Sequence, residues 1–182
     1  TSNTIADGPF PIVPYVVIDL VDTVENKADP TNKFNELEAK FVIKLISVID
    51  NIVEPQVTVG IITPYQGQKQ LLNEKLKNTE FKIKPEVNTI DGFQGQERDI
   101  IILSLVRAHE RPNTVGFLNS TQRMNVALTR AKHSMILCIS ANTLKVNQHW
   151  NKLIDDANRR RKYYKMNSSS DQNKITMIIK KR

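Results

Sequence analysis

Residues 94–99 form a short polar stretch whose side chains suit the binding of a ligand. Their sequence is Gln-Gly-Gln-Glu-Arg-Asp, and it stands between two apolar runs. The second run, residues 100–106, is almost entirely apolar and rich in β-branched residues, so we expect a strand that is buried on both faces. Polar loops beside such strands are common ligand-binding positions. The stretch is therefore a candidate binding loop.

Two arginines further along the chain could bind an anion. Arg123 and Arg130 are seven residues apart in residues 121–131, whose apolar positions predict a helix. Seven residues are nearly two helical turns, so both side chains are expected on one side of that helix. A pair of guanidinium groups beside a buried face suits a phosphate. The alternative is that both are solvated or pair with Glu97 and Asp99.

Two further side chains fit a nucleotide. Tyr65 directly follows a predicted strand and Pro64, where an aromatic ring can stack on a base. Glu97 could accept hydrogen bonds from ribose hydroxyls. The alternatives are an ordinary packed tyrosine and a surface ion pair of Glu97 with Arg98 or Lys69.

The elements that must position these residues alternate along the chain. Apolar runs predict strands at residues 15–21, 57–63, 87–90, 100–106 and 134–140. Helical spacing of apolar residues predicts helices at residues 36–52, 65–77, 121–131 and 148–160. Strands this apolar need cover on both faces, which favours a doubly wound α/β domain with a mostly parallel sheet. Ligands then bind at the carboxyl ends of the strands.

Composition narrows the class of protein. The 182 residues suffice for one domain with a core, and 26 Lys and Arg against 19 Asp and Glu give a formal charge of +7. A basic balance suits a polyanionic partner, although part of it lies near the end of the chain, at residues 159–162 and 180–182. The single cysteine, Cys138, excludes an internal disulfide and is expected to be a buried thiol. We expect an intracellular protein without a membrane span or signal peptide.

Three segments together resemble one known family. They are VGIITPYQGQ at residues 59–68, VNTIDGFQGQERDIIILSLVR at 87–107 and GFLNSTQRMNVALTRAKHSMILC at 116–138. In this order they closely resemble motifs IV, V and VI of the superfamily 1 RNA/DNA helicases, the group that contains the nonsense-mediated-decay helicase. NKFNELEA at 32–39 resembles the segment before motif IV, and NQHWNKLIDDANRR at 147–160 is most similar to the senataxin branch.

The resemblance covers residues 15–161 and implies a fold and a function. Such helicases have two RecA-like domains, with ATP and Mg²⁺ in the cleft between them and a single strand across both. This chain resembles the second RecA-like domain, a three-layer α/β/α unit, between an irregular lead-in at 1–14 and a basic, serine-containing tail at 162–182 that is expected to be mobile. The sequence has no G-x-x-x-x-G-K-[ST] loop and no D-E-x-x box. We therefore expect the Mg²⁺ ligands in the first domain, no metal site in this chain, and no ATP hydrolysis by this chain on its own.

The resemblance also implies roles for single residues. Arg130 matches the motif VI arginine that reaches the γ-phosphate as an arginine finger, and Arg123 matches a second basic position that supports it. Thr63 and Thr89 match positions beside the nucleic-acid backbone, where contacts carry no sequence information.

The remaining implied contacts are to the nucleotide. Gln94 and Gly95 match the motif V turn near the phosphates. Glu97 matches the acidic residue at the sugar, and Tyr65 matches the motif IV aromatic beside the adenine.

Two classes of function are compatible with these matches. The first is the second motor domain of an ATP-dependent helicase, with partners that are single-stranded RNA, DNA or an RNA–DNA hybrid and the first RecA-like domain. The second is a non-catalytic nucleic-acid-binding or scaffold domain that keeps the fold. The resemblance favours the motor and implies a nuclear location.

Overall fold

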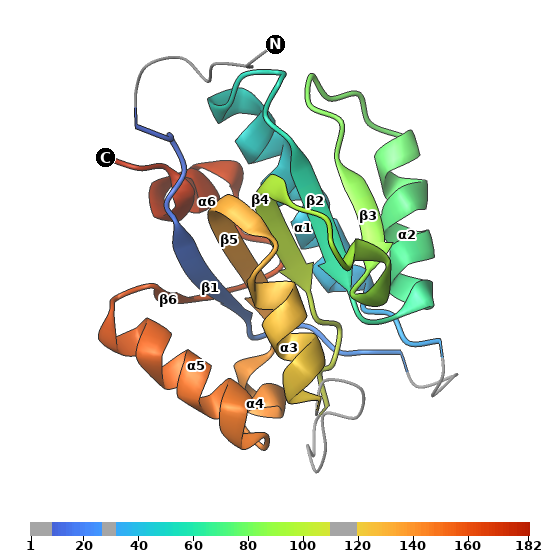
Figure 1. The fold of residues 1–182 in the computed structure, drawn as a ribbon, viewed down its shortest axis with the longest axis vertical. Helices are drawn as coiled ribbons and strands as arrows, with labels where there is room; N and C mark the ends of the chain where they lie inside the picture. Colours follow the sequence, from blue (N-terminus) through green and yellow to red (C-terminus); the bar gives the residue numbers. More distant parts are fainter. Residues whose placement is uncertain (1–8, 27–31, 110–119) are drawn as a thin grey trace.

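A computed structural model describes residues 9–26, 32–109 and 120–182 (Figure 1). Six strands form one sheet in the order β3-β2-β4-β5-β1-β6, and every neighbouring pair is parallel. The strands are β1 (Tyr15–Leu20), β2 (Val59–Thr63), β3 (Glu86–Thr89), β4 (Arg98–Ser104), β5 (Ala131–Ile139) and β6 (Tyr163–Met166). The predicted RecA-like α/β class with a parallel sheet is confirmed.

Helices cover both faces of the sheet. One face packs against α1 (Glu36–Ile52), α2 (Gln66–Lys77) and α6 (Gln172–Ile179). The other packs against the 3₁₀ turn η1 (Asp91–Phe93), α3 (Thr121–Leu128), α4 (Ala141–Leu144) and α5 (Gln148–Arg159). Ile61 and Ile62 show the alternation, because they lie on opposite faces and both are fully buried. This double cover explains why the strands are apolar throughout.

Cys138 lies on β5 within the core and is fully buried, as predicted. Burial raises the pKa of its thiol well above the ordinary value, which keeps the thiol protonated and unreactive. Within the described residues, no helix has both the length and the apolar character needed to cross a membrane.

Helix α1 begins where the sequence predicts, and side chains of its first turn also form hydrogen bonds with the end of β4. Asn35 is the N-cap, and its side-chain oxygen accepts from the Glu38 N–H at 3.1 Å. A full capping box does not form, because the Asn35 N–H donates to Gln68 Oε1 at 2.9 Å. Glu38 turns instead to the end of β4, where Oε1 accepts from the Ser104 hydroxyl at 2.6 Å and the Val106 N–H at 2.9 Å.

Glu38 should make the stability of the domain depend on pH. Burial raises its pKa from 4.5 to about 7, although the hydrogen bonds from Ser104 and Val106 oppose the shift. Because the folded state then holds the proton more tightly, the stabilising contribution is complete below pH 4.5 and is lost as the pH rises through 7. We expect the free energy of unfolding to fall by about 3 kcal/mol across this window.

The matched variant is Glu38→Gln, which keeps a similar shape but cannot titrate. Urea unfolding at pH 5 and pH 8 should show a smaller loss of stability in the variant than in the unaltered chain. Equal losses in both proteins would show that Glu38 does not titrate in this range.

The α3–β5 boundary differs from the expectation. The helix was predicted to run to residue 131, but it ends at Leu128, where the Thr129 hydroxyl donates to the Asn125 carbonyl at 2.9 Å. Strand β5 then begins at Ala131, which pairs with Arg98, rather than at residue 134. Hydropathy could not show this, because residues 131–133 extend the strand beyond the buried part of the sheet.

The last 21 residues are part of the fold, although residues 162–182 were expected to be a mobile tail. Strand β6 pairs with β1 over four residues, and Ile175 and Ile179 of α6 are fully buried in the core. The lead-in is likewise packed where it is described, since Ile12 is buried and the Phe10 ring stacks on His133. The rest of the lead-in, residues 1–8, and residues 110–119 between β4 and α3 lie outside the described residues.

Candidate nucleotide and strand-binding edges

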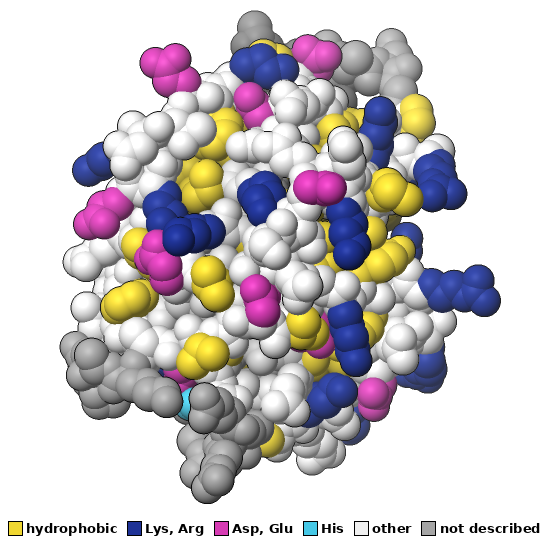
Figure 2. All heavy atoms as spheres, turned by 180° about the vertical axis from the view of Figure 1, so that it is seen from behind, with side chains coloured by type: hydrophobic (Ala, Val, Ile, Leu, Met, Phe, Trp, Pro, Cys, Tyr) yellow, Lys and Arg dark blue, Asp and Glu magenta, His cyan; other side chains and the backbone are white. Residues whose placement is uncertain are grey.

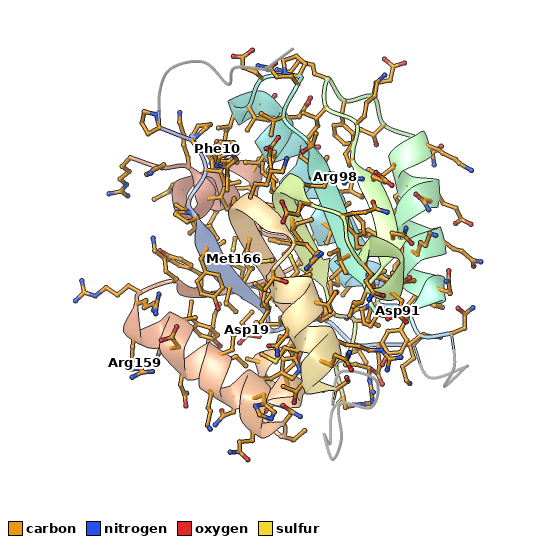
Figure 3. All side chains as sticks on the ribbon, viewed as in Figure 1. Phe10, Asp19, Asp91, Arg98, Arg159 and Met166 are labelled. Atoms are coloured by element: carbon orange, nitrogen blue, oxygen red, sulfur yellow. The ribbon has the colours of Figure 1, made fainter. Side chains whose placement is uncertain are left out.

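A parallel sheet has two chemically different edges, and both carry candidate residues. We call the end where the strands start the amino edge and the end where they finish the carboxyl edge. The seven residues of β4 separate the two edges by about 20 Å. Figure 3 shows the separation, because Arg98 lies at one edge while Asp19 and Asp91 lie at the other.

Arg130 lies at the amino edge, directly after α3. Its backbone carbonyl accepts from the Arg98 N–H at 3.1 Å. Its side chain folds back onto the helix, with Nε donating to the Val126 carbonyl and Nη2 to Thr129 Oγ1, both at 3.1 Å. These two bonds fix the guanidinium plane and leave other N–H donors available. No carboxylate of the described residues pairs with it, so the alternative of an ion pair with Glu97 or Asp99 does not apply to Arg130.

The Asp99 carboxylate binds Thr58 and lies near His133, which explains why it forms no ion pair with Arg130. Its carboxylate accepts from the Thr58 N–H at 2.9 Å and the Thr58 hydroxyl at 3.0 Å, and it lies 3.8 Å from His133. These contacts join β2, β4 and β5 at the amino edge. Asp99 therefore fixes the frame around Arg130 without neutralising it.

Glu97 is exposed and directly precedes Arg98, whose N–H donates to the Arg130 carbonyl. The Arg98 guanidinium donates to the backbone carbonyl of Glu97 at 2.8 Å, pairs with Glu86 at 2.5 Å and lies 5.3 Å from the centre of the Phe93 ring. The Glu97 carboxylate makes no hydrogen bond or ion pair within the described part of the chain. The expected alternative, a pair with Arg98 or Lys69, is not formed.

The turn at Gln94 and Gly95 crosses the sheet face between the two edges. The Gln96 N–H donates to the Phe93 carbonyl at 3.0 Å, and Gly95 has φ +76°, which glycine adopts without strain. A side chain at Gly95 would meet no atom within 4 Å, so the backbone, and not crowding, requires glycine here. The turn is open to solvent and can approach a ligand closely.

Arg123 and Arg130 are kept apart by the helix that carries the first of them. Arg123 lies in the first turn of α3, 3.7 Å from Asp91, and the two face a hollow of about 320 Å³ that Gln94 also lines. Arg130 lies beyond the other end of α3, and seven residues of helix correspond to about 10 Å along its axis. The expectation that both arginines stack beside one phosphate is therefore not supported by the geometry.

Thr63, Tyr65 and Thr89 lie at the carboxyl edge, and their exposure differs. Thr63 is fully buried, and its hydroxyl has no hydrogen-bond partner among the described residues. Thr89 is half-buried, and its Oγ1 accepts from the Gly92 N–H at 3.2 Å. Tyr65 is 8% exposed, and its hydroxyl lies 3.4 Å from Arg107 Nη1. The structure therefore brings Tyr65 to the opposite edge from Glu97 and Arg130, as a packed aromatic residue.

A buried ionic cluster beside Tyr65 was not found from the sequence. The Glu25 carboxylate accepts from Arg107 Nε at 2.8 Å, from His109 Nδ1 at 2.9 Å and from the Ala108 N–H at 3.2 Å, and Lys33 lies at 3.4 Å. Glu25 and Arg107 are each only 6% exposed. The partners are 82 residues apart in sequence, so no local pattern reveals the pair. The cluster joins the segments that follow β1, β2 and β4.

The backbone between the cluster and the core is strained. Val106 has φ +71°, and the Arg107 N–H donates to the Leu105 carbonyl at 2.7 Å, which closes a three-residue γ-turn around a β-branched residue. Asn35 Nδ2 donates to the Val106 carbonyl at 3.1 Å, and Glu38 binds its N–H. Such strain persists where the surroundings over-determine the backbone, and it is concentrated at functional sites.

Comparison with known proteins gives one consistent result. A family described as AAA domain matches residues 2–142. The probable helicase senataxin of Homo sapiens is 40% identical over 154 residues, which are 83% of this chain and 6% of that protein. Helicase SEN1 of Saccharomyces cerevisiae is 35% identical over 82% of this chain, and the ATP-dependent helicase NAM7 of the same organism is 35% identical over 80%. The chain spans 7% and 16% of those two proteins.

Proposed function

Because this chain belongs to the AAA domain family and is a senataxin-like superfamily 1 helicase domain, we propose that it is the second motor domain of an ATP-dependent RNA/DNA helicase. In this role it binds neither the triphosphate nor Mg²⁺ by itself. It completes a nucleotide site on a facing first domain and carries part of the single-strand track. The matched relatives are far longer than this chain, which leaves room for that first domain in them.

The observation that carries the proposal is the state of Arg130 and Glu97. Both lie at the amino edge, and neither is neutralised by a described residue of the opposite charge. The Arg130 guanidinium is fixed by two bonds to α3 and Thr129 yet keeps free donors, which is what a group needs to stabilise charge on a transferring phosphoryl group without reorganising. Glu97 offers a carboxylate acceptor to the ribose hydroxyls.

A nucleotide held by the facing domain would meet Arg130 and the neighbouring turn of this chain. ATP with Mg²⁺ supplies the phosphoryl group that is transferred to water, and the facing domain holds it. Arg130 then reaches the γ-phosphate, and the open turn at Gln94 and Gly95 lies on the approach to the phosphates. Arg123, at the other end of α3 and paired with Asp91, is assigned a supporting role at the hollow beside Gln94.

The strand track is assigned to the carboxyl edge. Thr89 and the turn that follows it present backbone and hydroxyl groups to phosphates. Tyr65 lies on this edge and not beside Glu97, so we assign it here and not to the adenine. Thr63 is fully buried at the end of β2, so we assign it to the packing beneath this edge. Figure 2 shows the face covered by α1, α2 and α6, where lysine and arginine side chains are interspersed with aspartate and glutamate.

Two assays on the purified chain test the proposal. ATP turnover should be absent, because the sequence has no G-x-x-x-x-G-K-[ST] loop to cradle the β- and γ-phosphates. Single-strand binding should be weak, independent of base sequence and salt-dependent, with a slope near −0.7 per phosphate contacted. The double variant Arg159→Ala with Arg161→Ala is the control for the basic cluster of residues 159–162 at the end of α5, which could bind a strand through its charge alone. Steady turnover, or binding that disappears only in this control, would contradict the assignment.

A further inference from the structure

A second hollow opens at the carboxyl edge, away from the residues assigned above. It measures about 480 Å³ and is formed where β1, β5 and β6 end. Asp19 and Tyr163 lie in its wall, Ser140 and Asn142 come from the start of α4, and Lys145 and Lys165 complete the lining. Figure 3 shows Asp19 at this end of the sheet. None of these residues belongs to the three helicase motifs.

The topology makes this hollow a natural ligand site. After β1 the chain leaves toward α1 on one face of the sheet, and after β5 it leaves toward α4 and α5 on the other. Because β1 and β5 are neighbours, the two departing segments open a crevice between them. Ligands of open α/β sheets bind at such reversal points, outside the carboxyl ends of the strands.

The charges of the hollow are arranged unequally. Asp19 accepts from the Ala141 N–H at 2.9 Å and from the Tyr163 hydroxyl, and Asp22 accepts from the N–H and hydroxyl of Ser168 at 2.8 and 2.5 Å. Both acids are thus bound within the protein. Lys145 and Lys165 are exposed and have no acidic partner among the described residues. Two ammonium groups therefore remain available to a ligand.

The mixed lining selects a particular kind of anion. Two lysines and two acids nearly cancel, so a small bare anion gains little from the hollow. Hydroxyl and amide groups on Ser140, Asn142 and Thr23 can instead bind a polar organic group, and Thr23 Oγ1 is buried without a partner in the described structure. A ligand that carries a phosphate and also polar organic groups can bind both the two lysines and these hydroxyl and amide groups. A nucleoside phosphate has this composition.

The hollow also continues the proposed strand track. His109 lines it and contacts the Arg107 guanidinium, which in turn reaches the Tyr65 hydroxyl at 3.4 Å. These three side chains connect the end of β2 to the end of β5 along one edge. A strand that runs from the end of β3 to the hollow at the end of β1 would cross four strand spacings, which is about 19 Å.

We propose that this hollow binds one nucleoside phosphate unit, with Lys145 and Lys165 at the phosphate and the polar wall at the sugar and base. The inference rests on the proposed strand-binding function and extends its track beyond the helicase motifs. The same chemistry is present in a nucleotide of a bound single strand and in a free mononucleotide.

The test is the double variant Lys145→Ala with Lys165→Ala in the whole chain. Fluorescently labelled oligothymidylate and oligouridylate probe the strand, and labelled AMP probes a free nucleotide. Losing one phosphate contact should weaken strand binding about fivefold near 0.1 M salt and reduce the salt slope by about 0.7. The matched control, Lys82→Ala with Lys84→Ala, removes the same charge at the amino edge and should change affinity less than about twofold, because distant charges are screened. Asn142→Trp should block the hollow without changing charge.

The outcomes distinguish binding in the hollow from the proposed strand-binding function of the whole domain. Weaker oligonucleotide binding in both hollow variants supports a strand unit, and weaker AMP binding alone supports a free nucleotide. If the unaltered chain binds oligonucleotides and the hollow variants match the lysine control with both probes, the inference is overturned while the strand track stands. If the unaltered chain binds no oligonucleotide, the proposed strand function itself fails.

Discussion

Replacing Arg130 with alanine in a protein that carries both motor domains should lower ATP turnover by roughly 10³- to 10⁵-fold. Affinity for ATP should change little, because an arginine finger acts mainly on the charge that develops during phosphoryl transfer. The structure supports a large effect, since two bonds to Val126 and Thr129 hold the guanidinium in place before any ligand arrives. Steady-state turnover and equilibrium nucleotide binding, measured on the same preparation, separate the two quantities.

Two variants serve as controls for this experiment. Arg130→Lys keeps the positive charge but loses the planar fork, so it should recover only a small part of the rate. Arg123→Ala removes an arginine that pairs with Asp91 at the far end of α3, and its loss should be much smaller. Turnover that survives in Arg130→Ala, or an equal loss in Arg123→Ala, would show that Arg130 is not the arginine finger. Absence of turnover in the unaltered two-domain protein would favour the non-catalytic scaffold.

Replacing Glu25 with leucine should destabilise the domain by roughly 3–5 kcal/mol, because it leaves the Arg107 charge buried without its carboxylate. The same change removes the acceptor for the Ala108 N–H, the carboxylate beside His109 Nδ1 and the charge partner of Lys33. Urea unfolding followed by circular dichroism measures the loss. A shift of this size is a large fraction of the stability of an ordinary domain.

The double variant Glu25→Leu with Arg107→Met distinguishes a buried charge from simple loss of packing. Apolar residues of similar volume in both places should restore much of the lost stability, since replacing a whole buried pair is often close to neutral. A double variant as unstable as Glu25→Leu would show that the cluster stabilises the domain through its shape. Lys75→Met, which breaks the more exposed pair with Glu36, should cost no more than about 1 kcal/mol.

The sheet and most helices could be predicted because their signals are local. Helix α1 starts at the Asn35 cap and ends at Ile52, as the apolar spacing indicates, and the strand runs are apolar because both faces are covered. The short final elements gave weaker signals. Strand β6 spans four residues and α6 eight, so each depends on packing against the rest of the fold and not on its own pattern.

The candidate site was predictable as a set of residues but not as an arrangement. Helical spacing placed Arg123 and Arg130 together, yet α3 ends at Leu128 because Thr129 bonds back to its last turn. Tyr65 follows β2, as expected, but β2 ends at the carboxyl edge, while Glu97 precedes β4 at the amino edge. Sequence order does not tell which edge a loop residue reaches once the chain crosses the face of a sheet.

The role of Arg130 as an arginine finger can be tested by comparing two affinities in a protein with both motor domains. One is for ADP with a metal fluoride that mimics the transferring phosphoryl group, and the other is for a non-hydrolysable ATP analogue. If Arg130 acts from the amino edge on the transition state, Arg130→Ala should weaken the first by about as much as it slows turnover and leave the second nearly unchanged. Equal weakening of both, or of neither, would show that this domain does not supply the arginine finger.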